Sequence, residues 1–228
     1  MAQYQIAGLA VEMDVFGRTL RQAVPYEETF EGPADIRVTC DPQQLLELHP
    51  ELRDLDSAYY LGSGTSFAKQ LLKHGGFQLH SSAVLLEGKA YLFSAPSGTG
   101  KSTHTEKWCR LYGAAYLNDD KPALRRGEDG WTAYGTPWSG KHDLSMPRSA
   151  PLGSVAFLRQ GEANEICRLE PAEGVEMLIS QSLRFLNAEQ MGLQLDLLDR
   201  LLREVPVWQL TCRNDDAAAE LSYRHMVR

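Results

Sequence analysis

The chain has 228 residues, of which 43% are hydrophobic and 23% charged, so it is long enough to bury the core of one large domain or two small ones. Its formal net charge is −7, from 23 basic and 30 acidic side chains, and this excess repels polyanions, so no nucleic-acid partner is expected. The four cysteines lie far apart in the sequence, and the N-terminus does not resemble a signal peptide. No run approaches the roughly 18 apolar residues that a membrane helix needs. We therefore expect a cytoplasmic protein with no membrane partner.

The first third of the chain mixes strand and helix patterns but carries no chemical motif. The predicted elements are strands over residues 3–15 and 36–40 and helices over 43–48 and 67–72, with a loop at Gly62-Ser63-Gly64 between the two helices. We therefore expect residues 1–76 to form an N-terminal layer on a single kinase-like domain that spans residues 1–228.

The middle of the chain predicts a hairpin that leads into a glycine-rich loop. Two apolar runs, Ala83–Leu86 and Ala90–Ser94, flank a Gly-bearing turn at residues 87–89 and indicate two antiparallel strands. Residues 102–112 then have the length and polarity of a helix, which Gly113 is placed to end. Residues 114–117 predict another buried strand, which leads into Asn118-Asp119-Asp120.

The last third again alternates strand and helix patterns. We expect a strand over residues 131–134, a second hairpin of residues 155–159 and 166–169 around Gly161, helices over 172–185 and 187–204, a strand over 207–210 and a helix over 217–226. Because hairpins and helices are interspersed, the chain predicts an α/β fold with a sheet that is not purely parallel.

The glycine-rich segment Ala95–Ser102 has the spacing of a phosphate-binding loop, with alanine in the first glycine position. Gly98 and Gly100 permit a sharp turn whose N–H groups point at phosphate oxygens. Lys101 supplies a positive charge, the Ser102 hydroxyl suits Mg²⁺, and the next helix directs its positive end at the same anion. The alternative is a turn that only links strand to helix. We predict binding of ATP by Ser97, Gly98, Thr99, Gly100, Lys101, Ser102 and Thr103.

Two further features of this region predict phosphoryl transfer. Asp119 and Asp120 end a strand one helix after the loop, where one carboxylate would hold Mg²⁺ and the other would take a proton from an attacking hydroxyl. The same Asn-Asp-Asp-Lys-Pro composition is also typical of a turn. His80 begins the hairpin that leads into the loop, so hairpin geometry predicts that it lies near the phosphates, although a lone histidine is more often structural.

Basic side chains follow in a Gly- and Pro-rich segment. Lys141 and Arg148 are candidates to contact the substrate or to stabilise charge on a transferring phosphoryl group. The alternative is a solvated surface loop.

Residues His80–Asp120 resemble the core of the HPr kinase/phosphorylase family in the order and spacing of a histidine, a hairpin, A-P-S-G-T-G-K-S-T, a helix and N-D-D. The resemblance implies the mixed-sheet P-loop fold that this family shares with phosphoenolpyruvate carboxykinase. It also implies that His80 is an active-site histidine, that Lys101 and Ser102 bind phosphate and metal, and that Asp119 and Asp120 supply a metal ligand and a general base.

The predicted function is an ATP- and Mg²⁺-dependent kinase that phosphorylates a hydroxyl of a peptide, a protein or a small metabolite. A regulatory module that binds or hydrolyses NTP is the alternative, and a small-molecule kinase with an all-parallel sheet is a third. The acceptor, the reversibility of the reaction, the roles of the two aspartates and the formation of a homo-oligomer stay open at this point.

Overall fold

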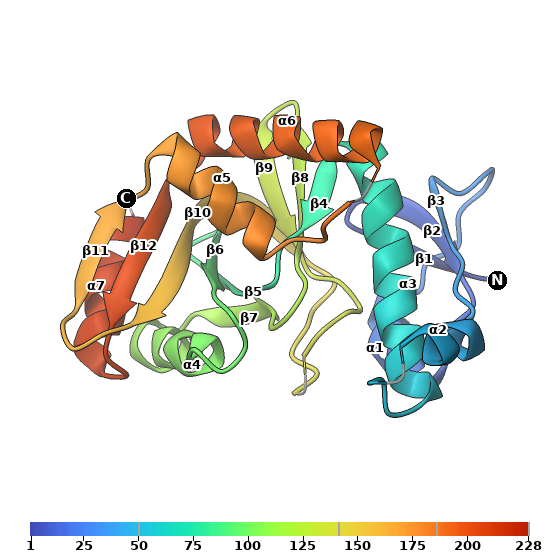
Figure 1. Cartoon of the computed structure of the whole chain (residues 1–228), viewed down its shortest axis with the longest axis horizontal. Helices are drawn as coiled ribbons and strands as arrows, with labels where there is room; N and C mark the ends of the chain where they lie inside the picture. Colours follow the sequence, from blue (N-terminus) through green and yellow to red (C-terminus); the bar gives the residue numbers. More distant parts are fainter. Residues whose placement is uncertain (50, 141, 186, 228) are drawn as a thin grey trace.

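A mixed β-sheet forms the centre of the protein in the computed structural model, which describes residues 1–49, 51–140, 142–185 and 187–227 (Figure 1). Its nine strands are β4 (Gly76–Gln78), β5 (Ser81–Leu86), β6 (Lys89–Ser94), β7 (Ala115–Asn118), β8 (Ala123–Gly127), β9 (Gly130–Tyr134), β10 (Ser149–Gln160), β11 (Glu165–Arg168) and β12 (Val207–Cys212). They lie in the order β4-β8-β9-β10-β6-β5-β7, and β12 and β11 continue the sheet from β10. The long strand β10 pairs with β9 at its start, with β6 in its middle and with β12 at its end.

The strand that leads into the glycine-rich loop has one antiparallel and one parallel neighbour. β6 pairs antiparallel with β5 and parallel with β10. The β5–β6 turn places Glu87 and Gly88 at φ 50° and 77°, as a two-residue hairpin turn requires. The predicted hairpin and the predicted mixed α/β fold class are confirmed, and the all-parallel alternative does not fit this arrangement.

Helices cover both faces of the sheet (Figure 1). α5 (Pro171–Ser180) and α6 (Ala188–Glu204) pack over one face, with Leu178 and Leu198 in the largest buried cluster. α4 (Lys101–Tyr112) and α7 (Asp216–Met226) pack against the other face around the buried ring of Trp108. α4 begins at the glycine-rich loop and ends at Gly113, which adopts φ 69°. These helices fall close to where the sequence predicts them, except that the segment after Ser180 is not helical.

The first 75 residues form a separate layer beside the sheet (Figure 1). A small sheet of β1 (Ala2–Ile6), β2 (Leu9–Met13) and β3 (Ile36–Val38) packs with α1 (Gly17–Ala23), α2 (Pro42–Leu48) and α3 (Leu55–Leu71). Two short 3₁₀ turns, Val24–Tyr26 and Leu72–His74, complete it.

Two predictions for this layer are wrong. The single strand expected over residues 3–15 is a hairpin, because Ala7 and Gly8 adopt φ 55° and 69° and reverse the chain. The loop expected at Gly62-Ser63-Gly64 lies inside α3, which runs through these residues without a break. Here the glycines allow close packing: a Cβ on Gly64 would lie 3.1 Å from the ring of the fully buried Trp138.

The second predicted hairpin is also wrong. β10 and β11 follow each other in sequence, but β12 lies between them and pairs parallel with β10 and antiparallel with β11. The helix predicted over residues 172–185 ends at Ser180, because the next residues run beside the strand ahead of β5: the His80 N–H donates to Gln181 O at 2.7 Å, and Leu79 bridges to Ser182.

Candidate functional site

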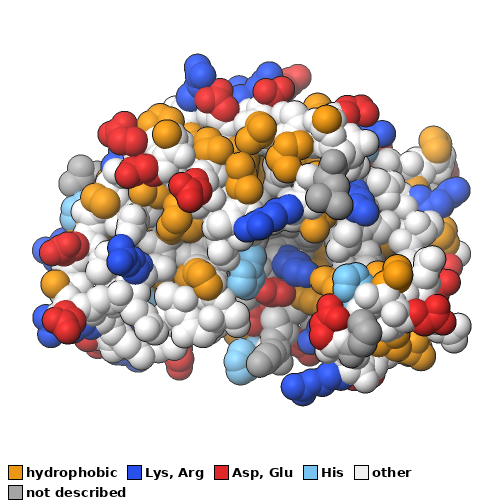
Figure 2. All heavy atoms as spheres, in the orientation of Figure 1, with side chains coloured by type: hydrophobic (Ala, Val, Ile, Leu, Met, Phe, Trp, Pro, Cys, Tyr) orange, Lys and Arg blue, Asp and Glu red, His pale blue; other side chains and the backbone are white. Residues whose placement is uncertain are grey.

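A hollow of about 540 Å³ lies where the glycine-rich loop faces the end of β7 and the N-terminal layer. We call it the phosphate pocket. Figure 2 shows charged and histidine side chains gathered in the depression between the N-terminal layer and the rest of the molecule. The pocket is lined by Arg18, Tyr60, His80, Ser97, Gly98, Gly100, Lys101, Ser102, Thr103, Asp119, Asp120, Ser139, Gly140 and His142. His80, Lys101, Asp119 and Asp120, all predicted from sequence, therefore meet in one hollow.

The loop has the backbone of an anion cradle. Gly98 and Gly100 adopt φ 82° and 110°, conformations that a side chain would strain, and Gly100 is the N-cap of α4. The first N–H groups of α4 have no partner within the helix, so they face the pocket together with the positive end of the helix dipole. The Lys101 ammonium donates to the Ala95 carbonyl oxygen at 2.6 Å, and burial lowers its pKa. Lys101 is thus held inside the loop, close to where phosphate oxygens would lie.

The two aspartates face different partners. Asp119 is 8% exposed and accepts a hydrogen bond from the Gly140 N–H, and burial raises the pKa of its carboxyl. It also lines a second hollow together with Ser102 and Thr103. Asp120 instead has its Oδ2 2.7 Å from the Tyr60 hydroxyl and its Oδ1 3.4 Å from His80 Nε2.

Asn118 explains why the acidic pair adopts this turn. Its Oδ1 accepts from the N–H groups of Asp120, at 2.9 Å, and Lys121, at 2.7 Å. Its Nδ2 donates to the Thr136 carbonyl oxygen at 2.9 Å. An asparagine side chain that caps its own turn in this way fixes the direction of the residues that follow. The turn that the composition predicts is therefore present, and it carries Asp119 and Asp120 into the lining of the phosphate pocket.

The His80 ring is oriented by Gln181, which contacts the ring nitrogen farther from Asp120. Its Nδ1 lies 3.0 Å from Gln181 Oε1, so Nδ1 is the protonated nitrogen and Nε2 points to Asp120. Burial lowers the pKa of the imidazole, and the charge of Lys101 lowers it further. The ring is therefore neutral at pH 7 and presents an acceptor nitrogen to the pocket.

Other predicted site residues lie elsewhere. Thr99 lines the adjoining hollow on the far side of the loop. Arg148 is exposed and is not among the residues that line the phosphate pocket. Lys141 lies outside the described residues.

Two residues that line the phosphate pocket, Arg18 and Tyr60, come from the N-terminal layer, and no sequence motif predicts them there. The Arg18 guanidinium carbon lies 4.0 Å from the centroid of the Tyr60 ring, and among the described residues the buried Arg18 Nε has no hydrogen-bond partner. The Arg18 N–H donates to Asp56 Oδ1 at 2.6 Å, which fixes the start of α1 against α3. The layer predicted to lack chemical motifs thus contributes a cation and a hydroxyl to the pocket.

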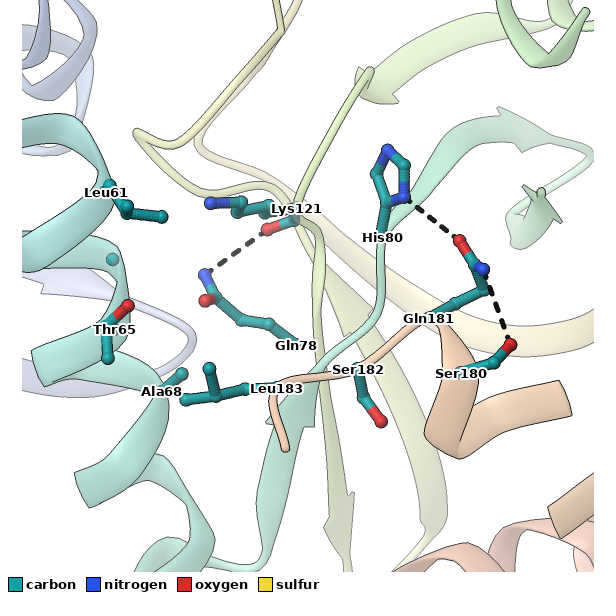
Figure 3. A pocket seen from close by; sticks show the side chains of 11 residues that line it. Leu61, Thr65, Ala68, Gln78, His80, Lys121, Ser180, Gln181, Ser182 and Leu183 are labelled. Atoms are coloured by element: carbon teal, nitrogen blue, oxygen red, sulfur yellow. Dashed lines mark hydrogen bonds between the residues drawn. The ribbon is translucent and has the colours of Figure 1, made fainter. Parts of the chain in front are cut away.

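Besides the hollow that Asp119 lines, two more adjoin the phosphate pocket, one at the glycine-rich loop and one at His80. The first, of about 430 Å³, shares Gly98, Gly100 and Thr103 with it and continues to Leu158, Gln160, Arg213 and Asn214; we call it the Asn214 hollow. The second, of about 290 Å³, shares His80 and continues between α3 and residues 180–183; we call it the Lys121 cavity (Figure 3). The three hollows therefore form a row from the loop to the N-terminal layer.

The described residues contain no cluster of three or more His, Cys, Asp or Glu side chains that would form a complete metal site. Mg²⁺, however, needs only one or two protein ligands when phosphates and water supply the others. The Asp119 carboxylate and the Ser102 hydroxyl, both oxygen donors beside the loop, fit that requirement. No described helix is long and apolar enough to cross a membrane.

Residues 63–213 match the protein family described as "SynChlorMet cassette protein ScmC". The chain belongs to this family. The matched region contains the whole loop, His80, Asp119 and Asp120, whereas Arg18 and Tyr60 precede it. No curated protein matches the chain.

Among solved structures, the chain is similar to the HPr(Ser) kinase/phosphatase from Coxiella burnetii, with 10% identity and a TM-score of 0.38. The likeness covers 66% of this chain and 99% of that one.

Proposed function

We propose that this member of the ScmC family is a kinase that transfers the γ-phosphate of ATP to a hydroxyl group of a peptide, a protein or a small metabolite. The observation that supports it is the meeting of Lys101, His80 and the two aspartates in one hollow at the start of a helix. Phosphoryl transfer needs this combination of anion-binding N–H groups, a cation and a carboxylate base.

The row of hollows suggests how ATP lies. The phosphates bind the loop N–H groups and Lys101, while the nucleoside extends into the Asn214 hollow, which offers Leu158 for contact and Gln160 and Asn214 as hydrogen-bonding groups. The γ-phosphate then points toward His80 and Asp120. This direction leaves its far side open to an acceptor, as in-line displacement requires.

Asp120 is our candidate for the general base. The acceptor oxygen attacks the γ-phosphorus, its proton passes to the Asp120 carboxylate, and the bond to the β–γ bridging oxygen breaks to release ADP. The Tyr60 hydroxyl donates to this carboxylate at 2.7 Å and so holds it in place, beside His80 Nε2 at 3.4 Å.

Asp119 is our candidate for the metal ligand, together with Ser102. Bound Mg²⁺ would neutralise charge on the phosphate oxygens. The role of Asp119 in this scheme is to keep a carboxylate oriented toward the loop, for which its hydrogen bond from the Gly140 N–H is suited.

The test is transfer of labelled γ-phosphate from ATP to a panel of hydroxyl acceptors. Lys101→Ala should lose nucleotide binding, whereas Asp120→Asn should keep it and lose transfer by roughly 10²–10⁴-fold, the contribution of a general base. ATP bound and hydrolysed only to water, with release stimulated by a protein partner, would contradict the kinase and favour the regulatory NTPase.

A further inference from the structure

The Lys121 cavity adjoins the phosphate pocket on the side away from the Asn214 hollow. His80 lines both the cavity and the pocket, so a molecule in the cavity would lie beside the imidazole and near the Asp120 carboxylate that it contacts. In-line transfer places the attacking oxygen opposite the leaving group. Since the nucleoside is expected on the other side of the loop, this cavity is where the acceptor would enter.

In the part of the chain that the structure describes, the only basic side chains in the walls of the cavity are His80 and Lys121, and its other walls are uncharged. Figure 3 shows α3 on one side, the segment after α5 on the other, and Gln78 between them. The apolar groups are Leu61, Ala68 and Leu183, and the remaining lining side chains are Thr65, Gln78, His80, Lys121, Ser180, Gln181 and Ser182. No Asp or Glu is among these lining residues.

Lys121 lies in this cavity without an anionic partner. Among the described residues its ammonium makes no hydrogen bond and no ion pair within 4.0 Å, and its Nζ lies over the Tyr60 ring, 4.9 Å from the centroid. The neighbouring Asp120 carboxylate already accepts a hydrogen bond from the Tyr60 hydroxyl at 2.7 Å. Burial lowers the pKa of Lys121, and Arg18 lowers it further, against an opposing effect of Asp120. A half-buried ammonium of this kind is stabilised when an anion binds beside it.

The turn that holds the acidic pair also directs Lys121. Its N–H donates to Asn118 Oδ1 at 2.7 Å, and its carbonyl oxygen accepts from Gln78 Nε2 at 3.5 Å and from the Thr136 hydroxyl at 2.7 Å. The backbone of Lys121 is therefore fixed relative to Asp120, one residue earlier. An anion bound at Lys121 would hold a neighbouring hydroxyl at a set distance from the candidate base.

We propose that the Lys121 cavity is the acceptor site and that it selects an acceptor carrying a carboxylate close to the hydroxyl that is phosphorylated. The inference rests on the proposed kinase function, which it deepens by naming the substrate class. A volume of about 290 Å³ suits a group of the size of one hydroxy-acid or one amino-acid residue. The carboxylate belongs either to a free small molecule or to the last residue of a chain, and both present the same chemistry to Lys121.

The test compares acceptors that differ only in the carboxylate. N-acetyl-L-serine and N-acetyl-L-serinamide form one pair, and a short peptide ending in serine, with a free or an amidated end, forms the second. We expect transfer of labelled phosphate to favour the carboxylate member of a pair by roughly tenfold or more in kcat/KM, as for a lost hydrogen bond to a charged group. The pair that is used more efficiently distinguishes a small molecule from a chain end.

Lys121→Met removes the charge and keeps most of the side-chain length. It should abolish the preference by raising KM for the carboxylate acceptor, and Lys121→Arg should restore it. Lys69→Met is the matched control, since Lys69 is exposed on α3 and does not line the cavity. Unchanged ATP binding by Lys121→Met would show that the variant is folded. Equal use of both members of each pair by the wild type, or an equal loss for both in Lys121→Met, would overturn the inference while leaving the kinase intact.

A binding measurement separates failure of the kinase from failure of the acceptor site. With a non-hydrolysable ATP analogue present, saturation-transfer NMR should detect N-acetyl-L-serine on the wild type and on Lys69→Met but not on Lys121→Met. If no acceptor is phosphorylated, this pattern still supports a carboxylate site and contradicts only the kinase. No signal with the wild type overturns the carboxylate site.

Discussion

At the scale of single residues, Arg18 is the side chain that most changes the interpretation of the site. It comes from α1, 83 residues before Lys101, and stacks on Tyr60 at the edge of the phosphate pocket. A guanidinium beside a transferring phosphoryl group stabilises the charge that spreads over its oxygens. This position can serve the role that the sequence assigns to Lys141 or Arg148.

We therefore expect Arg18→Ala to lower kcat roughly 10²-fold, in the range of a lost transition-state donor, with a smaller effect on KM for ATP. Steady-state kinetics with the best acceptor measures this, and Arg18→Lys should recover part of the rate. Arg21→Ala on the same helix is the control, because Arg21 is exposed and outside the pocket. Unchanged kcat in Arg18→Ala would contradict the catalytic role and leave Arg18 with a packing role against Tyr60.

His104 provides a pH-dependent contribution to stability. It is 5% exposed, its Nε2 lies 3.0 Å from Ser222 Oγ, whose own proton goes to the Ala219 carbonyl oxygen, and burial, aided by Lys107, lowers the pKa of the imidazole to about 4. The unfolded chain takes up this proton near pH 6.5 and the folded protein only near pH 4, so stability is full above pH 6.5 and falls as the pH drops through that window. The free energy of unfolding should decrease by about 2 kcal/mol between pH 7.5 and pH 5 from this residue.

Urea unfolding at several pH values measures this slope. His104→Gln retains a donor toward Ser222 but cannot titrate, so its unfolding free energy should vary less over the same range. An identical pH slope in the two proteins would mean that other groups cause the loss.

The sequence predicts the part of the site whose residues are joined by elements that follow one another directly in the chain. His80, the loop and the aspartates are joined by one hairpin, one helix and one strand, so their meeting follows from short-range geometry. Arg18, Tyr60 and Gln181 come from α1, α3 and the segment after α5, and only tertiary packing brings them to Asp120 and His80. An arginine, a tyrosine or a glutamine in an amphipathic segment does not indicate, from sequence alone, that its side chain reaches the site.

At the scale of elements, strand pairing is harder to predict than the strands themselves. The β5–β6 hairpin has a two-residue turn that fixes its partner, and it was predictable for that reason. β10 and β11 have a turn with Gly161, yet β12 competes for both and lies between them. A pairing that depends on β12, which follows only after α5 and α6, cannot be recognised from the local pattern.

Glycines in two helices give a test of packing at this scale. Gly192 lies exposed in α6 with no atom within 4 Å of a Cβ, whereas a Cβ on Gly64 in α3 would lie 3.1 Å from the buried Trp138 ring. Gly192→Ala should raise the free energy of unfolding by about 0.5–1 kcal/mol through helix propensity. Gly64→Ala gains the same propensity but should lower stability by about 1–3 kcal/mol through overpacking. Urea unfolding of the two variants measures both, and equal effects would contradict close packing at α3.

At the scale of the whole molecule, the N-terminal layer and the sheet share one buried cluster. Trp138, which follows β9, packs on Phe67 of α3 with ring centroids 4.7 Å apart and donates from Nε1 to Ser63 Oγ at 3.1 Å. The Tyr60 hydroxyl reaches both Asp120 Oδ2 and, at 2.8 Å, the Ser139 carbonyl oxygen. The phosphate pocket is therefore formed by the N-terminal layer and the sheet together, and a ligand that orders the pocket should also stabilise the N-terminal layer.

Hydrogen exchange tests this coupling. Mg²⁺ with a non-hydrolysable ATP analogue should slow amide exchange in the loop and α4, and also in α1 and the first half of α3, because Arg18 and Tyr60 line the pocket in which the phosphates are expected. In Arg18→Ala the protection of α1 should be lost while that of the loop remains, since Lys101 and the loop N–H groups are intact. Protection confined to the loop and α4 in the wild type would mean that the N-terminal layer takes no part in binding nucleotide, and the catalytic role proposed for Arg18 would then be untenable.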